Sequence, residues 1–281
     1  MKHWNRPSRH LHIALAAASG AVILAGIAHA EPRYTWVTAA ASTAAVTVAP
    51  SNTGAPAPNT LATRIAPPLG FTRVETAPGS WGEWLRGVPL KPEGAPVLTY
   101  TGAPKWRQDV HVAVLDIDVG KRDLQQCADA VMRLRAEWLY ASNRKSEIAF
   151  NDTDGKRRVF SKQNKQDYPS FRKYMDLVFA YAGTYSLDRE LKPVKLTDIQ
   201  IGDVFIKGGF PGHAVLVADM ATNAAGEKRF LLMQSYMPAQ DIHVLKNPNT
   251  TDDTPWYGTN IGLQLETPEW NFAGNQLKRW P

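Results

Sequence analysis

The clearest pattern of strands lies in the second half of the chain, where three apolar stretches follow one another closely. Residues 203–206, 213–219 and 230–235 are rich in apolar and β-branched side chains, and glycine-rich or polar turns separate them. An earlier stretch, residues 109–119, alternates in the same manner. Three strands in quick succession predict an antiparallel meander, preceded by at least one further strand.

Two stretches ahead of the meander have the period of an amphipathic helix. In residues 123–140 the apolar positions share one face, and Asp123 is the expected cap with Gln126 in capping-box spacing. Residues 168–182 repeat the pattern, and Gly183 supplies a stop. Helices followed by an antiparallel meander predict an α+β fold.

The beginning of the chain has the pattern of a secretory signal peptide. A basic start precedes an almost uncharged apolar run at residues 12–27, and Ala28-His29-Ala30 has the form of an A-x-A cleavage site. We therefore expect residues 1–30 to be removed and the protein to be exported, to the periplasm or the medium. No cysteine stands directly after the apolar run, which argues against an N-terminal lipid anchor.

The composition then changes twice along the chain. Residues 31–68 consist mainly of Ala, Thr, Ser and Pro, which predicts a disordered linker with little to bury. Residues 69–281 have a suitable length for a single α+β domain. No second apolar run approaches the length of a membrane span, so none is expected after signal cleavage.

Charge and cysteine content narrow the classes of function. The chain has 32 Lys+Arg and 26 Asp+Glu. Three of the basic residues lie in the signal, so the net charge of the expected mature protein is 29 − 26 = +3. That small excess gives no strong case for nucleic-acid binding. Cys127 is the single cysteine and only three histidines follow residue 30, so neither a disulfide nor a finger-type zinc site is expected. We expect no metal or organic cofactor.

Cys127 is the first candidate for chemistry, because it lies in the first turns of the predicted helix. Unpaired amides and the helix dipole favour an anion there, and reactive cysteines occupy such positions. Activation of this kind predicts a thiol pKa well below about 8.5. The alternative is a buried structural thiol, since Cys127 falls on the apolar face of the helix and free cysteines are commonly buried.

His213 and Gln234 lie on neighbouring strands of the predicted meander. A turn with the sequence Gly-Phe-Pro-Gly leads into His213 at the start of its strand, and Gln234 interrupts the apolar run of the next strand. An amide at that place can accept a hydrogen bond from one imidazole nitrogen and leave the other facing a thiol. The alternatives are a histidine satisfied at a turn and a glutamine bonded to backbone.

The order of these residues resembles the papain-like NlpC-type cell-wall peptidases. The resemblance covers Cys127 to Ser235 and rests on Gly202-Asp203, then His213-Ala214-Val215, then the polar Gln234. It implies a papain-like fold with N-terminal helices packed on an antiparallel sheet, with Cys127 as nucleophile, His213 as base and Gln234 as orienting residue. Around the cysteine this chain reads Gln-Cys-Ala-Asp, where that family usually has Asp-Cys-Ser-Gly.

Residues 70–281 also resemble a bacterial exported family of unknown function. Its marks are the runs DLQQCADAVMRLRAE, GGFPGHAVLVADM, QSYMPAQDIHVL and TPEW. This second resemblance implies no activity.

Other residues suggest further sites. Asp116 and Asp118 share a face of their strand and could act on a glycosidic bond, although solvated acids at a strand end give the same pattern. Trp81 and Trp256 are candidate substrate-binding residues in a possible groove, although aromatic residues this numerous more often serve core and surface packing. Tyr236 is a third candidate, because its segment follows Gln234 and could form a wall of the same cleft. His243 is expected to be structural.

From these observations we expect an exported papain-like thiol hydrolase that cleaves an amide bond in cell-wall peptide. Backbone amides at the start of the Cys127 helix would hold the oxyanion. The alternatives are a non-catalytic module that binds peptidoglycan or a protein on the same scaffold, and a glycosidase that uses Asp116 and Asp118.

Overall fold

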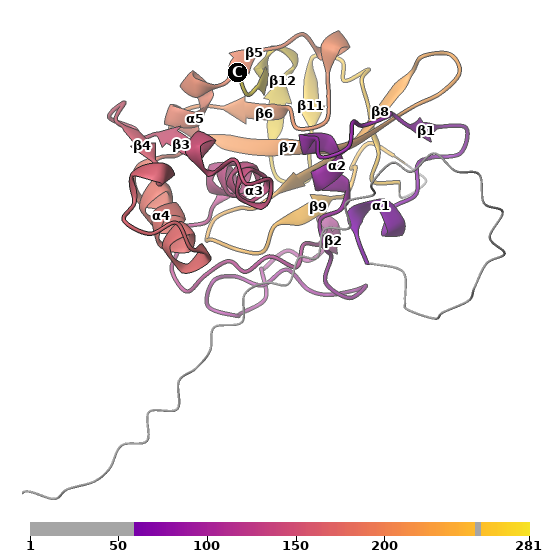
Figure 1. Cartoon of the computed structure of the whole chain (residues 1–281). Coiled ribbons are helices and arrows are strands. Elements are labelled where there is room, and N and C mark those ends of the chain that lie inside the picture. The colour runs from indigo at the N-terminus through magenta and orange to yellow at the C-terminus, as the bar shows by residue number, and fades with distance from the viewer. Residues whose placement is uncertain (1–58, 251–253) are drawn as a thin grey trace, which may run out of the picture. The chain divides into compact units, whose positions relative to one another are not determined.

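A computed structural model of the protein describes residues 59–250 and 254–281 (Figure 1). The predicted signal peptide and most of the predicted linker lie outside the described residues. The α-helices in the described part are α1 (Leu61–Arg64), α2 (Trp81–Arg86), α3 (Cys127–Ala141), α4 (Tyr168–Tyr181) and α5 (Thr184–Glu190). None of these helices is long and apolar enough to cross a membrane.

Most of the strands join one large sheet. In the described residues they are β1 (Thr72–Arg73), β2 (His111–Val114), β3 (Ala149–Asn151), β4 (Arg157–Val159), β5 (Lys192–Pro193), β6 (Val204–Lys207), β7 (His213–Thr222), β8 (Lys228–Gln234), β9 (His243–Leu245), β10 (Tyr257–Gly258), β11 (Gln264–Glu266), β12 (Asn271–Ala273) and β13 (Leu277–Arg279). The order across the sheet is β2-β9-β8-β7-β6-β13-β5, with β1 also on β7 and β10 also on β8. The pairs are antiparallel, and β3–β4 and β11–β12 form separate hairpins.

This architecture confirms the coarse prediction of helices combined with an antiparallel sheet. The meander is present, because β6, β7, β8 and β9 are consecutive in the chain and adjacent in the sheet. Figure 1 shows α3 against the strands of the meander with α4 beside it. The α+β class is therefore correct.

The central strand β7 explains why its sequence is apolar almost without interruption. Its side chains alternate between two hydrophobic cores, so both faces are buried. Ala214, Leu216 and Ala218 belong to the core shared with the helices, whereas Val215 and Val217 belong to a smaller core shared with β11 and β12. A strand of this kind needs apolar residues at odd and even positions alike.

The predicted boundary between linker and domain differs from the structure. Residues 59–68, which we placed in the linker, contain α1, and Leu61 is fully buried. The backbone N–H of Leu61 donates to the Val88 carbonyl, and the Trp256 indole donates to the carbonyl of Ala66. Long-range contacts of this kind order a short segment whose composition alone favours disorder.

The predicted helix boundaries also need correction. The helix expected over residues 123–140 begins at Cys127, with Gln126 at the cap position, so Asp123 does not cap it. The Asp123 carboxylate instead accepts from the backbone N–H of Ala239, across the molecule. Gly183 does follow α4, but it also precedes α5, a short helix that the sequence pattern did not indicate.

The strand predictions were correct in place and inexact in length. The strand expected over residues 109–119 is limited to β2, whereas β7 continues three residues beyond its predicted end. A bulge between Val217 and Asp219 interrupts the pairing of β7 with β8 and lets the strand continue.

Candidate functional site

His213 is the first residue of β7, and the turn before it admits only glycine at one position. A Cβ on Gly212 would lie 2.4 Å from both the Thr184 hydroxyl and the Gly209 carbonyl. This close approach fixes the path of the chain into the strand. The His213 side chain is 1% exposed and points to the same face as Val215, against the rings of Trp270 and Phe272.

Gln234 ends β8 and is bonded directly to His213. Its Oε1 lies 2.7 Å from His213 Nε2. An amide oxygen can only accept, so Nε2 carries the proton and Nδ1 holds the lone pair in the neutral ring. Burial lowers the pKa of His213 to about 4, although the bond to Gln234 acts in the opposite direction. The resting imidazole is therefore neutral near pH 7, with Nδ1 as its basic atom.

Cys127 occupies the first position of α3, as a nucleophile at a helix start would. Its pKa, however, is opposite to the one expected: burial and then the neighbouring Asp129 carboxyl raise the pKa of the thiol to about 11. The backbone N–H groups of Ala128 and Ala214 favour the thiolate but are outweighed. The side chain is 6% exposed, so desolvation dominates the helix dipole here.

The thiol and the imidazole lie beside the same end of β7. Cys127 comes from the helix side of the sheet and reaches the backbone N–H of Ala214, whereas the His213 ring lies on the opposite face. β7 begins at His213 and β8 ends at Gln234, so both groups lie where these two neighbouring strands start and stop. Within the described part of the chain the two side chains are not hydrogen-bonded to each other.

Tyr236 forms a wall beside both groups. Its ring centroid lies 5.0 Å from that of His213, and burial, then Glu269 and Cys127, raise the pKa of its hydroxyl. The Tyr236 side chain is half-buried, and Met237 next to it is exposed. Of the three aromatic residues expected to bind substrate, Tyr236 is the one that the structure places at this site.

Trp81 and Trp256 lie elsewhere. Trp81 begins α2 and packs on Trp84 and on Trp138, which is eleven residues from Cys127 and so about 16 Å along the helix. Trp256 is buried, and its indole nitrogen donates to the Ala66 carbonyl. Both indoles serve packing, and the structure does not bring them to His213.

His243 lies directly opposite Gln234 in the pairing of β8 with β9 and is fully buried. Its Nδ1 donates to the Asp241 carbonyl at 2.9 Å, so its Nε2 is an acceptor, 3.3 Å from the Gln234 amide nitrogen. Burial lowers the pKa of His243 to about 3. This neutral histidine thus holds the amide of Gln234.

The acidic residues singled out in the sequence have other partners. Asp116 and Asp118 are exposed and lie beyond β2, and Asp118 forms an ion pair with Arg172 at 2.8 Å. Asp203 of the Gly-Asp pair is buried and accepts two hydrogen bonds from Arg279 of β13, at 2.6 and 2.8 Å. Gly202 has a φ of +90° and lies against Trp81, where a Cβ would be 2.2 Å away. The Gly-Asp pair therefore joins the C-terminal strand to the sheet.

Two further residues of the site were missed from the sequence. Glu269 accepts from the Gln234 amide nitrogen at 2.8 Å, and Lys105 donates to the other oxygen of Glu269 at 2.6 Å. Glu269 belongs to the TPEW run, which marked a resemblance without suggesting a role. No local pattern links residues so far apart in the chain.

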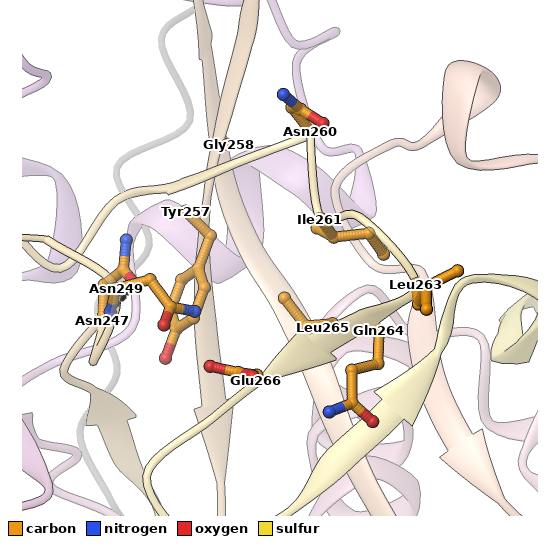
Figure 2. Close-up of a pocket in the computed structure, with 10 residues that line it drawn as sticks. All are labelled: Asn247, Asn249, Tyr257, Gly258, Asn260, Ile261, Leu263, Gln264, Leu265 and Glu266. Atoms are coloured by element: carbon orange, nitrogen blue, oxygen red, sulfur yellow. Dashed lines mark hydrogen bonds between the residues drawn. The ribbon is translucent and has the colours of Figure 1, made fainter.

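One hollow of the described surface lies away from this cluster. It has a volume of about 690 Å³ and lies beside β10 and β11 (Figure 2). Figure 2 shows amide side chains from Asn247, Asn249, Asn260 and Gln264 around it. Neither Cys127 nor His213 lines this hollow.

The described residues contain no group of three or more His, Cys, Asp or Glu side chains that could hold a metal ion. The groups that the structure brings together beside His213 include a thiol, an imidazole and an amide. The chain belongs to a family described as a domain of unknown function (4846), whose model matches residues 61–165 and 158–279. Comparisons with curated proteins and with solved structures gave no match.

Proposed function

We propose that the protein is an exported thiol hydrolase of papain-like type that cleaves an amide bond, in peptides of the cell wall. The observation that carries this proposal is the 2.7 Å bond between Gln234 Oε1 and His213 Nε2. It leaves Nδ1 as the basic nitrogen at the end of β7 that the Cys127 thiol also reaches. A nucleophile, a base and an orienting amide are the parts that such a reaction needs.

The reaction would begin from a neutral thiol and a neutral imidazole. As Cys127 Sγ attacks the carbonyl carbon, its proton passes to His213 Nδ1, and backbone N–H groups at the start of α3 stabilise the oxyanion. The carbon–nitrogen bond then breaks, the proton from Nδ1 goes to the leaving amine, and a thioester remains. Water adds to the thioester with His213 again as base, and the acid and the free thiol are released.

The resting geometry requires a movement before the first step. Cys127 and His213 are not hydrogen-bonded to each other within the described residues, and both are nearly inaccessible. Catalytic contacts are often loose without substrate and tighten in the complex. Rotation of the thiol or the ring at the strand end, with displacement of the half-buried Tyr236, would bring the two together.

The experiment is an assay of amide cleavage with defined muropeptides. Wild-type protein should release a new amine and a new carboxylate, detected by mass spectrometry, and a thioester adduct on Cys127 should accumulate on rapid acid quenching. Cys127→Ala should abolish both products, and His213→Ala should reduce them by orders of magnitude. Cleavage by the Cys127→Ala variant at the wild-type rate would exclude the proposal.

A second candidate function, a non-catalytic binding module, is favoured by the burial of Cys127 and the rise of its pKa to about 11. Under that alternative, the protein would sediment with purified peptidoglycan, and Cys127→Ala would bind as the wild type does. Binding of both proteins with no bond cleaved would favour the module over the hydrolase.

A further inference from the structure

Beyond the thiol, the imidazole and Gln234, the site contains a buried ion pair to which the proposed reaction assigns no part. Lys105 and Glu269 are 164 residues apart in the chain, and their side chains are 2% and 4% exposed, with Nζ 2.6 Å from Oε1. Burying two charges costs several kcal/mol in desolvation, and such a pair gives little net stability over an apolar one. Its position beside Gln234 suggests another use.

The pair acts on Gln234 through the second carboxylate oxygen. Glu269 Oε2 accepts from Gln234 Nε2 at 2.8 Å, while the amide oxygen of the same side chain accepts from His213 Nε2 at 2.7 Å. A carboxylate can only accept, so it allows a single orientation of the amide: nitrogen toward Glu269 and oxygen toward His213. His243 reinforces this orientation, since its Nε2 is also an acceptor for the Gln234 amide.

Two features hold the carboxylate in place. Glu269 lies in a tight turn in which the Thr267 backbone N–H donates to the Trp270 carbonyl at 3.0 Å. Arg107 donates to the Pro268 carbonyl at 2.9 Å and so fastens this turn to the segment that carries Lys105. The ammonium group of Lys105 also lies 4.8 Å from the centre of the Tyr236 ring.

We infer that Glu269, anchored by Lys105, is a positioning residue that orients the Gln234 amide and thereby sets the tautomer of His213. The chain of contacts is Lys105–Glu269–Gln234–His213. With the amide reversed, its N–H would face His213 Nε2, the proton would move to Nδ1, and the ring could no longer take a proton from Cys127. The inference rests on the proposed function for its catalytic meaning, whereas the orientation of the ring is independent of it.

The test compares Glu269→Gln with Glu137→Gln in the full chain. The first change removes the charged acceptor of the Gln234 amide and leaves the neutral His243 Nε2 as the weaker acceptor that still opposes a reversed amide. The matched control removes the carboxylate of another buried ion pair, Arg133–Glu137, with 2.6 Å between Nε and Oε1. The direct measurement is the tautomer of His213 from long-range ¹H–¹⁵N NMR spectra, with His213→Gln used to assign the signals.

The wild type should show the Nε2–H tautomer almost alone, Glu269→Gln a mixture with the Nδ1–H tautomer, and Glu137→Gln the wild-type pattern. For amide cleavage, kcat should fall about tenfold or more in Glu269→Gln with KM unchanged, since the wrong tautomer costs up to about 10⁴ in a serine protease triad. A wild-type tautomer in Glu269→Gln would overturn the inference.

Glu269→Gln leaves the Lys105 ammonium buried without its counter-charge, which could prevent folding. In that case the double variant Lys105→Met, Glu269→Gln removes both charges at similar volume, and it should give the same mixed tautomers. The two proposals fail separately. Cleavage by the wild type with no tautomer change in either variant overturns the positioning role alone, and a tautomer change without any wild-type cleavage overturns the hydrolase alone.

Discussion

The two ends of β7 bury polar groups in opposite ways. Near its far end Asp219 is fully buried and meets two cations, with Arg73 Nε and Arg86 Nε each 2.6 Å from one of its oxygens. At its beginning His213 is equally buried, but its partner is the neutral amide of Gln234. One strand thus carries a saturated ionic cluster at one end and a neutral imidazole at the other.

This difference between the two ends of β7 distinguishes a group that stabilises the fold from a group that can react. Every oxygen of Asp219 is occupied by a charged donor, and the backbone N–H of Met220 adds a further bond at 2.7 Å, so no atom is left to react. In His213 one nitrogen is bonded and the other is the basic atom. A group with one unused function and a fixed orientation is suited to proton transfer, whereas a saturated one is suited to holding elements together.

The largest effect is expected from removing the segment that supports the Asp219 end. Arg73 also donates to the Ile65 carbonyl, and Leu61 and Ile65 are buried. A protein that begins at Leu69 should lose about 3 to 6 kcal/mol of unfolding free energy relative to one that begins at Asn59, from the apolar area of these two side chains. Urea denaturation of the two proteins measures this difference in unfolding free energy.

Leu61→Ala in the longer protein is the control for packing as opposed to chain length, with an expected loss of about 2 to 5 kcal/mol. Equal urea midpoints for the two chain lengths would mean that residues 59–68 contribute nothing, as a linker would.

Removing the charge of Asp219 should have the next largest effect. Asp219→Asn leaves Arg73 and Arg86 facing a neutral amide in a buried site, and we expect a loss of about 3 kcal/mol in urea denaturation. Asp176→Asn, which breaks the exposed pair with Arg122, is the matched control and should cost less than about 1 kcal/mol. Equal losses in the two variants would remove the distinction between the saturated cluster and a surface pair.

At the beginning of β7 the comparison predicts that the Cys127 thiol reacts slowly with alkylating reagents. With the pKa of Cys127 raised to about 11, its thiolate fraction at pH 7 is about 300-fold below that of a free cysteine. Native protein should therefore react with iodoacetamide at least a hundredfold more slowly than urea-unfolded protein, and the rate should climb steeply above pH 9.

Rapid native labelling at pH 7 that disappears in His213→Ala would show the contrary, a preformed thiolate–imidazolium pair. Rapid labelling that is unchanged in His213→Ala would show an accessible thiol without a partner. The first result would make the beginning of β7 a charged site and remove the contrast with Asp219. The second would show that Cys127 is not buried as the structure has it.

How much of this could be predicted from the sequence depends on the range of the contacts. The strands β7 and β8 and the helices α3 and α4 follow from local periodicity, and the meander brings His213 and Gln234 onto neighbouring strands. The fold class and the proximity of His213 to Gln234 could thus be predicted from the sequence. The segment around Leu61 was not, because contacts with Val88 and Trp256 order it and its own composition does not.

The remaining parts of the site depend on tertiary structure. Nothing local connects Lys105 with Glu269, and their importance emerges only when both meet Gln234. The direction of the Cys127 pKa was mispredicted for a similar reason. A helix start favours the thiolate, but the burial that outweighs it comes from the sheet, whose packing on α3 no pattern within the helix reveals.

The smallest effect we predict is a pH dependence of stability from the neutral histidine at the beginning of β7. Burial lowers the pKa of His213 to about 4 in the folded protein, against about 6.5 in the unfolded chain. As the pH falls, the unfolded state binds this proton first. The stabilisation is therefore complete above pH 6.5 and is lost as the pH falls toward 4, by about 2 kcal/mol at pH 4.5. Asp129 and Asp203, whose pKa values burial raises, act in the opposite direction, so the total slope of stability against pH does not isolate the histidine.

The difference between the wild type and His213→Gln isolates the contribution of His213, because both proteins contain the same carboxylates. Unfolding free energies from urea denaturation at pH 7 and pH 4.5 should fall by about 2 kcal/mol more in the wild type than in the variant. Identical falls would mean that His213 accepts its proton as readily in the folded protein as in the unfolded one. The neutral ring that distinguishes this end of β7 from Asp219 would then not exist.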